Sequence, residues 1–190
     1  LHQAFLVGAS YELTMFGEIT IDLFETINQR FHQSSSIDKF ITLIYGEIKN
    51  DGEFRFISAA HPLPLVFSNE FNRIVNIDSH NFTNFVPIGT LPSGADIDNK
   101  NSHSMFGYKD RYSLNNLNVM GRGDILLLFS DGFTEQKGGE LNYVRDRLEQ
   151  QLILTKHLPA REIFFKIRED FINYCGAPDD DATLILIKRT

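Results

Sequence analysis

The segment Ile125-Leu126-Leu127-Leu128-Phe129-Ser130-Asp131-Gly132 places an acidic turn directly after a run of apolar residues. A continuous apolar run of this length is typical of a β-strand that is covered on both faces. A turn of Asp and Gly can end such a strand for backbone reasons alone, so an ordinary turn is one interpretation. On either interpretation, the sequence predicts a buried strand whose following carboxylate, that of Asp131, lies at the rim of a sheet.

A second acidic segment lies near the end of the chain. Asp179, Asp180 and Asp181 lead into the apolar run Thr183-Leu184-Ile185-Leu186-Ile187, which predicts another central strand. Crowded carboxylates repel one another unless a cation or hydrogen-bond donors compensate, although a solvated acidic loop is the simpler alternative. Two acidic strand ends in one small protein favour a hard-cation site, because Mg²⁺ and Mn²⁺ prefer carboxylate and water oxygens.

We expect the two acidic segments to meet at a common sheet edge and to share divalent ions. Two such ions about 4 Å apart can hold a hydroxide and clamp a phosphoryl group. The residues therefore indicate a metal hydrolase, for example one that acts on phosphate esters. A metal-dependent phosphodiesterase on another fold is a third interpretation, but it predicts His-rich ligation, and the six His are scattered.

Hydrophobic periodicity predicts the other elements. Helices are expected at 1–13, 20–32, 141–154 and 160–174, and strands at 40–48, 53–59, 63–67 and 112–119. The stretch 68–122 is expected to be mostly loop and is a candidate surface for a substrate or partner. Strands in hairpins with helices grouped together predict one α+β domain over 1–190, with helices packed on antiparallel sheets.

Composition excludes some classes of protein. The net charge of −7 and the lack of a Lys/Arg cluster argue against nucleic-acid binding. Cys175 is the single cysteine, which rules out an internal disulfide and fits a reducing compartment such as the cytoplasm. No apolar run approaches the ~18 residues that span a bilayer.

Several short motifs occur in a fixed order along nearly the whole chain. They are Phe40-Ile41-Thr42, Ser58-Ala59-Ala60-His61-Pro62, Pro87-Ile88-Gly89, Gly121-Arg122-Gly123-Asp124, Ser130-Asp131-Gly132-Phe133-Thr134-Glu135 and Asp180-Asp181-Ala182-Thr183. This series resembles the stage II sporulation protein E branch of the PPM metal-dependent protein serine/threonine phosphatases. The resemblance implies a β-sandwich of two antiparallel sheets flanked by helices, with two Mn²⁺ or Mg²⁺ ions at one edge. It also implies hydrolysis of phosphoserine or phosphothreonine by metal-activated water, without a phosphoenzyme.

The resemblance also implies roles for individual residues. Asp131 and Asp180 match metal-binding residues of the family, with Asp181 the next candidate ligand and Asp179 the third. Supporting or structural roles are expected for Gly132, Glu135, His61 and Thr183. In similar proteins the position of His61 is not a metal ligand, and we expect Glu135 to orient waters around the ions. Asp124 is expected to be structural.

The chain departs from the family pattern in two places. No early Gly-Asp-Val-Ser-Gly-His-Gly-like segment is found, so we expect the first strands and the bridging ligand to be absent. Such an incomplete site should bind cations weakly, leaving this chain alone inactive or very slow. An unpaired sheet edge would also invite dimerisation. Ala60 replaces the Gly that usually precedes His61.

The resemblance supports two alternative functions. The first is dephosphorylation of a regulatory phosphoprotein in bacterial signalling, such as an anti-anti-sigma factor, under the control of an upstream sensor or receiver domain. The second is a degenerate phosphatase fold that serves as a binding or signalling module without catalysis. Metal binding and phosphopeptide turnover would discriminate between them.

Overall fold

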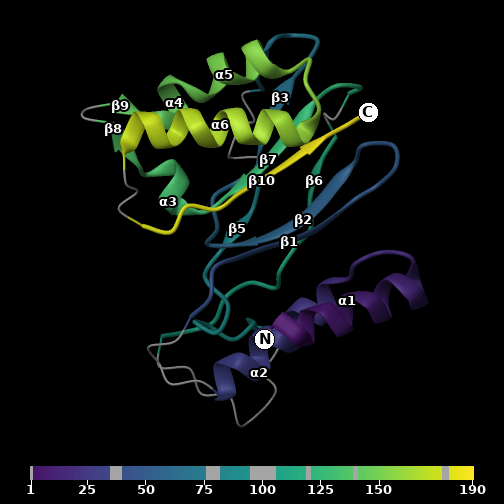
Figure 1. Cartoon of the computed structure of the whole chain (residues 1–190). Coiled ribbons are helices and arrows are strands. Elements are labelled where there is room, and N and C mark those ends of the chain that lie inside the picture. Colours follow the sequence, from purple (N-terminus) through teal and green to yellow (C-terminus); the bar gives the residue numbers. More distant parts are fainter. Residues whose placement is uncertain are drawn as a thin grey trace. The chain divides into compact units, whose positions relative to one another are not determined.

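The structure is a computed structural model that describes residues 2–34, 40–75, 82–94, 106–118, 121–138, 141–176 and 180–190 (Figure 1). Two compact units make up the chain, and each is assembled from separate stretches. The first unit comprises Leu1–Lys49, Phe54–His61 and Phe82–Asn116. The second comprises Asn50–Glu53, Pro62–Asn81 and Leu117–Thr190. The single domain expected from chain length stays a prediction.

Two helices and a small sheet form the first unit. Its elements are α1 (His2–Phe16), α2 (Ile21–Ser34), β1 (Leu43–Ile48), β2 (Phe54–Ala59), β5 (Asn84–Phe85) and most of β6 (Asn115–Leu117). The predicted hairpin is confirmed, because β1 and β2 pair antiparallel with Leu43 opposite Ala59. β5 pairs parallel with β2, and β6 also pairs with β2.

The core of the first unit is largely aromatic. Phe24 of α2 is fully buried, and its ring centroid lies 4.5 Å from that of Tyr112. Phe5 of α1 contacts the same ring of Phe24, with the centroids 5.6 Å apart. These contacts explain the helical spacing of apolar residues in α2, because one stripe of the helix faces the core.

A four-stranded antiparallel sheet and a group of helices form the second unit. The strand order is β10-β7-β3-β4. The sheet strands are β3 (Leu65–Ser68), β4 (Arg73–Ile74), β7 (Ile125–Phe129) and β10 (Leu184–Lys188), and the remaining elements are α3 (Asp131–Thr134), β8 (Lys137–Gly138), β9 (Leu141–Asn142), α4 (Tyr143–Asp146), α5 (Leu148–Thr155) and α6 (Ala160–Cys175). The predicted α+β class, with mainly antiparallel sheets, is confirmed.

The prediction that β7 is a buried strand is confirmed, whereas the prediction that β10 is a central strand is wrong. In β7, Ile125, Leu126 and Leu127 are fully buried, and the strand lies between β10 and β3. β10 was expected to be central, but it ends the strand order of the described sheet, and Ile185 is 51% exposed. One face of β10 packs on the core of the second unit through Leu184 and Leu186. An apolar run therefore did not distinguish an edge strand from a central one.

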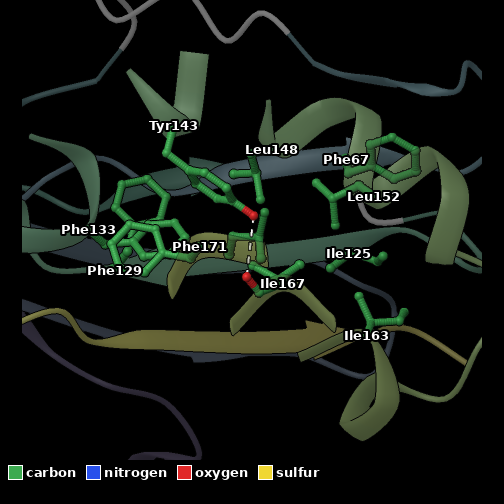
Figure 2. Packing of buried hydrophobic residues seen from close by; sticks show 11 residues of the cluster. Phe67, Ile125, Phe129, Phe133, Tyr143, Leu148, Leu152, Ile163, Ile167 and Phe171 are labelled. Atoms are coloured by element: carbon green, nitrogen blue, oxygen red, sulfur yellow. Dashed lines mark hydrogen bonds between the residues drawn. The ribbon is translucent and has the colours of Figure 1, made fainter. Parts of the chain in front are cut away.

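The core of the second unit lies among β7 and helices α4, α5 and α6 (Figure 2). Tyr143 is fully buried, and its hydroxyl donates a 3.3 Å hydrogen bond to the carbonyl of Ile167. The rings of Phe133 and Phe171 stack with centroids 4.7 Å apart. Phe133 belongs to α3, so this stack anchors the helix that carries Asp131 to helix α6.

Two local predictions need correction. The helix expected at 141–154 is broken, because β9 pairs with β8 before α4 and α5 begin. Asn142 starts α4, since its side chain accepts a 3.1 Å hydrogen bond from the amide of Arg145. The strand expected at 112–119 is shorter, at Asn115–Leu117. Among the described helices, none has the length and apolar character that crossing a bilayer requires.

Candidate metal centre

The pairing of β10 with β7 brings the two acidic segments to one end of the second unit's sheet. These strands run antiparallel, and Leu184 lies opposite Phe129. The residues that follow β7 therefore lie beside the residues that precede β10. This confirms the prediction that segments some 50 positions apart meet at a common sheet edge, with Asp131 on one and Asp180 and Asp181 on the other.

Ser130 joins these two segments through three hydrogen bonds. Its hydroxyl donates to the carbonyl of Asp181 at 3.0 Å and accepts from the amide of Thr183 at 2.9 Å. The amide of Ser130 also donates to the carbonyl of Thr183 at 3.1 Å. Sequence reasoning assigned no role to Ser130, although a hydroxyl directly before a candidate ligand was a usable signal. Its position fixes where both acidic segments lie.

Gly132 permits the close approach of the same segments. A Cβ at this position would lie 2.5 Å from the carbonyl oxygen of Asp181. No real side chain tolerates that separation from a backbone atom, so any other residue would push Asp181 away. Asp131 and Gly132 begin the four-residue helix α3, where a simple turn was expected. The requirement for Gly132 is therefore steric.

The predicted ligands are exposed carboxylates. Asp131, Asp180 and Asp181 all reach solvent. One oxygen of Asp131 accepts from the amide of Gly132 at 2.9 Å, and one oxygen of Asp180 accepts from the amide of Asp181 at 2.7 Å. These local bonds orient the carboxylates of Asp131 and Asp180 and leave the second oxygen of each for other partners. Asp179 lies outside the described residues.

The carboxylate oxygens of these residues are suitable ligands for a hard divalent cation, but there are too few of them to complete its coordination. Carboxylate oxygens suit Mg²⁺ and Mn²⁺. In the part of the chain that the structure describes, however, no three His, Cys, Asp or Glu side chains converge closely enough to hold a metal. Asp131 and Asp180 can thus supply part of a coordination shell. Water or further oxygen donors must supply the rest.

The supporting residues fall in both units. Thr183 pairs with Ser130 through its backbone, as described above. The amide of Glu135 donates to the carbonyl of Asp131 at 2.7 Å and closes α3, while its side chain is exposed. Its expected role in orienting waters stays a prediction. Asp124 is buried and accepts from the amides of Asn69 and Gly121 at 2.8 and 2.5 Å, which confirms a structural role.

His61 belongs to the first unit. Its carbonyl accepts hydrogen bonds from the hydroxyl of Ser58 at 3.1 Å and from the side chain of Asn84 at 3.3 Å. The preceding Ala60 has a φ of 50°, in the left-handed region that glycine adopts without cost. Ala60 therefore adopts a backbone conformation that is more favourable for glycine. The supporting role of the imidazole stays a prediction.

An open groove of about 580 Å³ in the second unit adjoins the acidic segments. Apolar side chains of α3, α6 and β10 line most of it, together with one cation and the acidic segment that precedes β10. The lining residues are Phe133, Phe164, Arg168, Phe171, Ile172, Asp180, Asp181, Ala182 and Leu184. A groove of this size lies in the range of ligand-binding sites.

Residues 4–190 match the profile of the family described as stage II sporulation protein E (SpoIIE). No curated protein gives a significant match.

Solved structures share the fold at low identity. The RsbU and RsbW domains from Mycobacterium tuberculosis align with a TM-score of 0.63 and 20% identity over 95% of this chain and 45% of theirs. The SiaA-PP2C domain of Pseudomonas aeruginosa aligns with a TM-score of 0.59 and 16% identity, over 97% of this chain and 65% of that domain. The Mn-presoaked phosphatase domain of SpoIIE from Bacillus subtilis aligns with a TM-score of 0.56 and 15% identity, over 94% of this chain and 70% of that domain. This chain covers 45% to 70% of the length of these solved chains. At these identities the similarity shows a shared fold.

Proposed function

Because this chain belongs to the stage II sporulation protein E family, in the PPM branch that includes SpoIIE- and RsbU-like phosphatase domains, we propose that it hydrolyses phosphoserine or phosphothreonine on a protein. The observation that carries the proposal is the junction made by Ser130. This junction joins the segment of Asp131 to the segment of Asp180 and Asp181 at one sheet end.

Divalent ions, Mn²⁺ or Mg²⁺, would supply an activated water and neutralise phosphoryl charge when bound. Asp131 and Asp180 are the proposed ligands, with Asp181 the next candidate, and Ser130 and Gly132 hold them in place. Glu135 lies one helical turn from Asp131 and is exposed, which suits the orientation of surrounding water. No protein nucleophile is proposed.

The substrate is proposed to be a regulatory phosphoprotein of a bacterial signalling system, for instance a small anti-anti-sigma factor. An upstream sensor or receiver region in the same protein would control the activity. The net charge of −7 supports a need for local cations, because a phosphoryl group would otherwise be repelled by the acids around the site.

Turnover by this chain alone is proposed to be slow. The described residues bring carboxylates from only two segments, and no three described His, Cys, Asp or Glu side chains lie close enough together to hold a metal. A partial ligand set binds cations weakly and positions water poorly.

A direct test measures phosphate release from phosphoserine peptides by the full-length protein with and without Mn²⁺. The matched variant Asp131→Asn keeps the size of the side chain and removes its charge. We expect Mn²⁺-dependent release by the wild type and a loss of at least a hundredfold in Asp131→Asn, as for removal of a key electrostatic group. Equal release by both proteins would reject the assignment of Asp131.

The alternative function is a phosphatase fold that binds a partner without catalysis. The lack of a three-ligand cluster among the described residues is the observation that favours it. The full-length protein would then show no turnover and no Mn²⁺ binding, and Asp131→Asn would change neither.

A further inference from the structure

The groove beside the acidic segments carries features that metal binding does not use. Phe164, Arg168 and Ile172 line it from α6 and recur at intervals of four residues, so they form a single row along one helix face. Ile172 is 40% exposed, and Arg168 is also exposed. This row is an apolar stripe with one cation in its middle.

The floor of the groove is rigid and apolar. Phe133 and Phe171 are 3% and 4% exposed, and their rings stack on each other. Leu184 at the start of β10 completes this surface. The floor belongs to the packed core of the second unit, so an incoming side chain would meet a preformed surface. Binding there would order few protein side chains and would therefore lose little entropy.

Arg168 is available for an external anion. Two other arginines of the second unit have acidic partners: Arg147 forms an ion pair with Asp170 at 2.6 Å, and Arg145 contacts Asp146. Among the described residues, no ion pair or hydrogen bond to Arg168 is found. A guanidinium at the rim of an apolar groove favours a carboxylate, which it can bind through two parallel hydrogen bonds.

We propose that this groove binds the polypeptide substrate beside its phosphorylated residue, taking one apolar side chain on the Phe164–Ile172 row and one acidic side chain on Arg168. The proposal rests on the proposed phosphatase function. Asp180 and Asp181 contribute both to the groove lining and to the candidate metal centre, so an occupant of the groove lies next to the reacting phosphate. Phenylalanine and arginine are also enriched at protein interfaces relative to the rest of the protein surface.

The test uses the full-length protein with Mn²⁺ and labelled phosphoserine peptides in which a Leu-Glu pair occupies successive positions on either side of the phosphoserine. Peptides with Gly-Ser in place of Leu-Glu are the controls. Equilibrium binding is measured by fluorescence anisotropy. Turnover is measured on the same peptides and on p-nitrophenyl phosphate, which lacks the Leu and Glu side chains.

Three variants separate the contributions. Arg168→Gln removes the proposed anion contact, and Ile172→Ser removes an exposed apolar one. Arg161→Gln is the matched control, because Arg161 is an exposed arginine of the same helix outside the groove. We expect Arg168→Gln to weaken binding of the best Leu-Glu peptide roughly tenfold, as for loss of a charge-assisted hydrogen bond. Ile172→Ser should weaken it by a factor of about three or more.

For both groove variants, KM for that peptide should rise by a larger factor than KM for p-nitrophenyl phosphate. Arg161→Gln should behave as wild type. Equal binding of Leu-Glu and Gly-Ser peptides, or equal loss in Arg161→Gln and Arg168→Gln, would overturn the groove proposal even if turnover is normal. Groove-dependent binding without any turnover would keep the groove proposal and reject the phosphatase function, so the two failures are distinguishable.

Discussion

The hydroxyl of Ser130 donates a 3.0 Å hydrogen bond to the main-chain carbonyl of Asp181, across a sequence separation of 51 residues. The same hydroxyl accepts a hydrogen bond from the amide of Thr183. One small side chain at the end of β7 therefore holds the acidic segment that precedes β10. The geometry of the candidate metal centre depends on this junction as much as on the carboxylates themselves.

Replacement of Ser130 by Ala should lower both stability and cation affinity. The carbonyl of Asp181 would lose a donor and the amide of Thr183 an acceptor, so we expect a loss of about 1–2 kcal/mol in the free energy of unfolding. Mn²⁺ affinity should fall as well, because Asp180 and Asp181 are no longer held beside Asp131. Denaturant unfolding and calorimetric Mn²⁺ titration measure the two effects.

Ser68→Ala is the matched control for this change. Ser68 is 5% exposed in the same unit, and its hydroxyl accepts the amide of Phe71 at 3.3 Å. It should lower stability without changing Mn²⁺ affinity. If both serine variants changed the affinity equally, the junction would have no specific role in the site.

Replacement of Ala60 by Gly should stabilise the protein. The φ of 50° at Ala60 is unfavourable for a residue with a Cβ, and glycine removes this cost. After subtraction of glycine's greater entropy in the unfolded chain, a net gain of about 0.5 kcal/mol is expected. Asn72, with a φ of 54°, is the comparison position.

Asparagine tolerates the left-handed region better than alanine does, so Asn72→Gly should be neutral or slightly destabilising. The unfolding midpoints of the two glycine variants, each compared with the wild type, measure this difference. A destabilised Ala60→Gly variant would show that the conformation of Ala60 carries no strain.

Two buried tyrosine hydroxyls of the second unit should respond differently to replacement by Phe. Tyr143→Phe removes the hydrogen bond to the carbonyl of Ile167 and should cost about 1 kcal/mol. The hydroxyl of Tyr174 is buried without a hydrogen-bond partner in the described structure, so Tyr174→Phe should leave stability unchanged or raise it. Equal losses in denaturant unfolding would contradict this difference.

Alkaline pH should destabilise the first unit through Tyr45. Burial, together with the negative charges of Glu12 and Glu47, raises the pKa of Tyr45 from 10.0 to about 12. Since the folded-state pKa lies above the unfolded value, this contribution to stability is complete below pH 10.0 and is lost as pH rises toward about 12. Burial also raises the pKa of Tyr112, which should add to the loss.

Tyr45→Phe tests this pH dependence. The variant should retain wild-type stability near neutral pH, because the hydroxyl of Tyr45 has no hydrogen-bond partner among the described residues. Between pH 10.0 and about 12 its stability should fall less steeply than that of the wild type. Identical slopes in pH-dependent unfolding would rule out a contribution from Tyr45.

Features set by local sequence were predictable. The apolar run at 125–129 identified β7, and the acids beside the two strand ends identified the edge where the segments meet. The Asp-Gly turn identified the hairpin of β1 and β2. Each of these features depends on the alternation or chemistry of neighbouring residues, which one sequence displays directly.

Features set by distant partners were not predictable. An apolar strand at the edge and one at the centre have the same local pattern, so the edge position of β10 was missed. The helix expected at 141–154 failed because Leu141 pairs with Gly138 instead of continuing a helical turn. The partners of the Ser130 hydroxyl were missed for the same reason, since both lie more than 50 residues away.

The most direct test of a cation shared by the two acidic segments is a paramagnetic NMR titration of the full-length protein with Mn²⁺. A bound Mn²⁺ ion broadens the amide signals of nearby residues. We predict that signals from Ser130–Thr134 and from Asp180–Thr183 broaden together at the same low Mn²⁺ concentration, and that Asp131→Asn abolishes both effects. Broadening of one segment alone, or of neither, would contradict a shared metal centre.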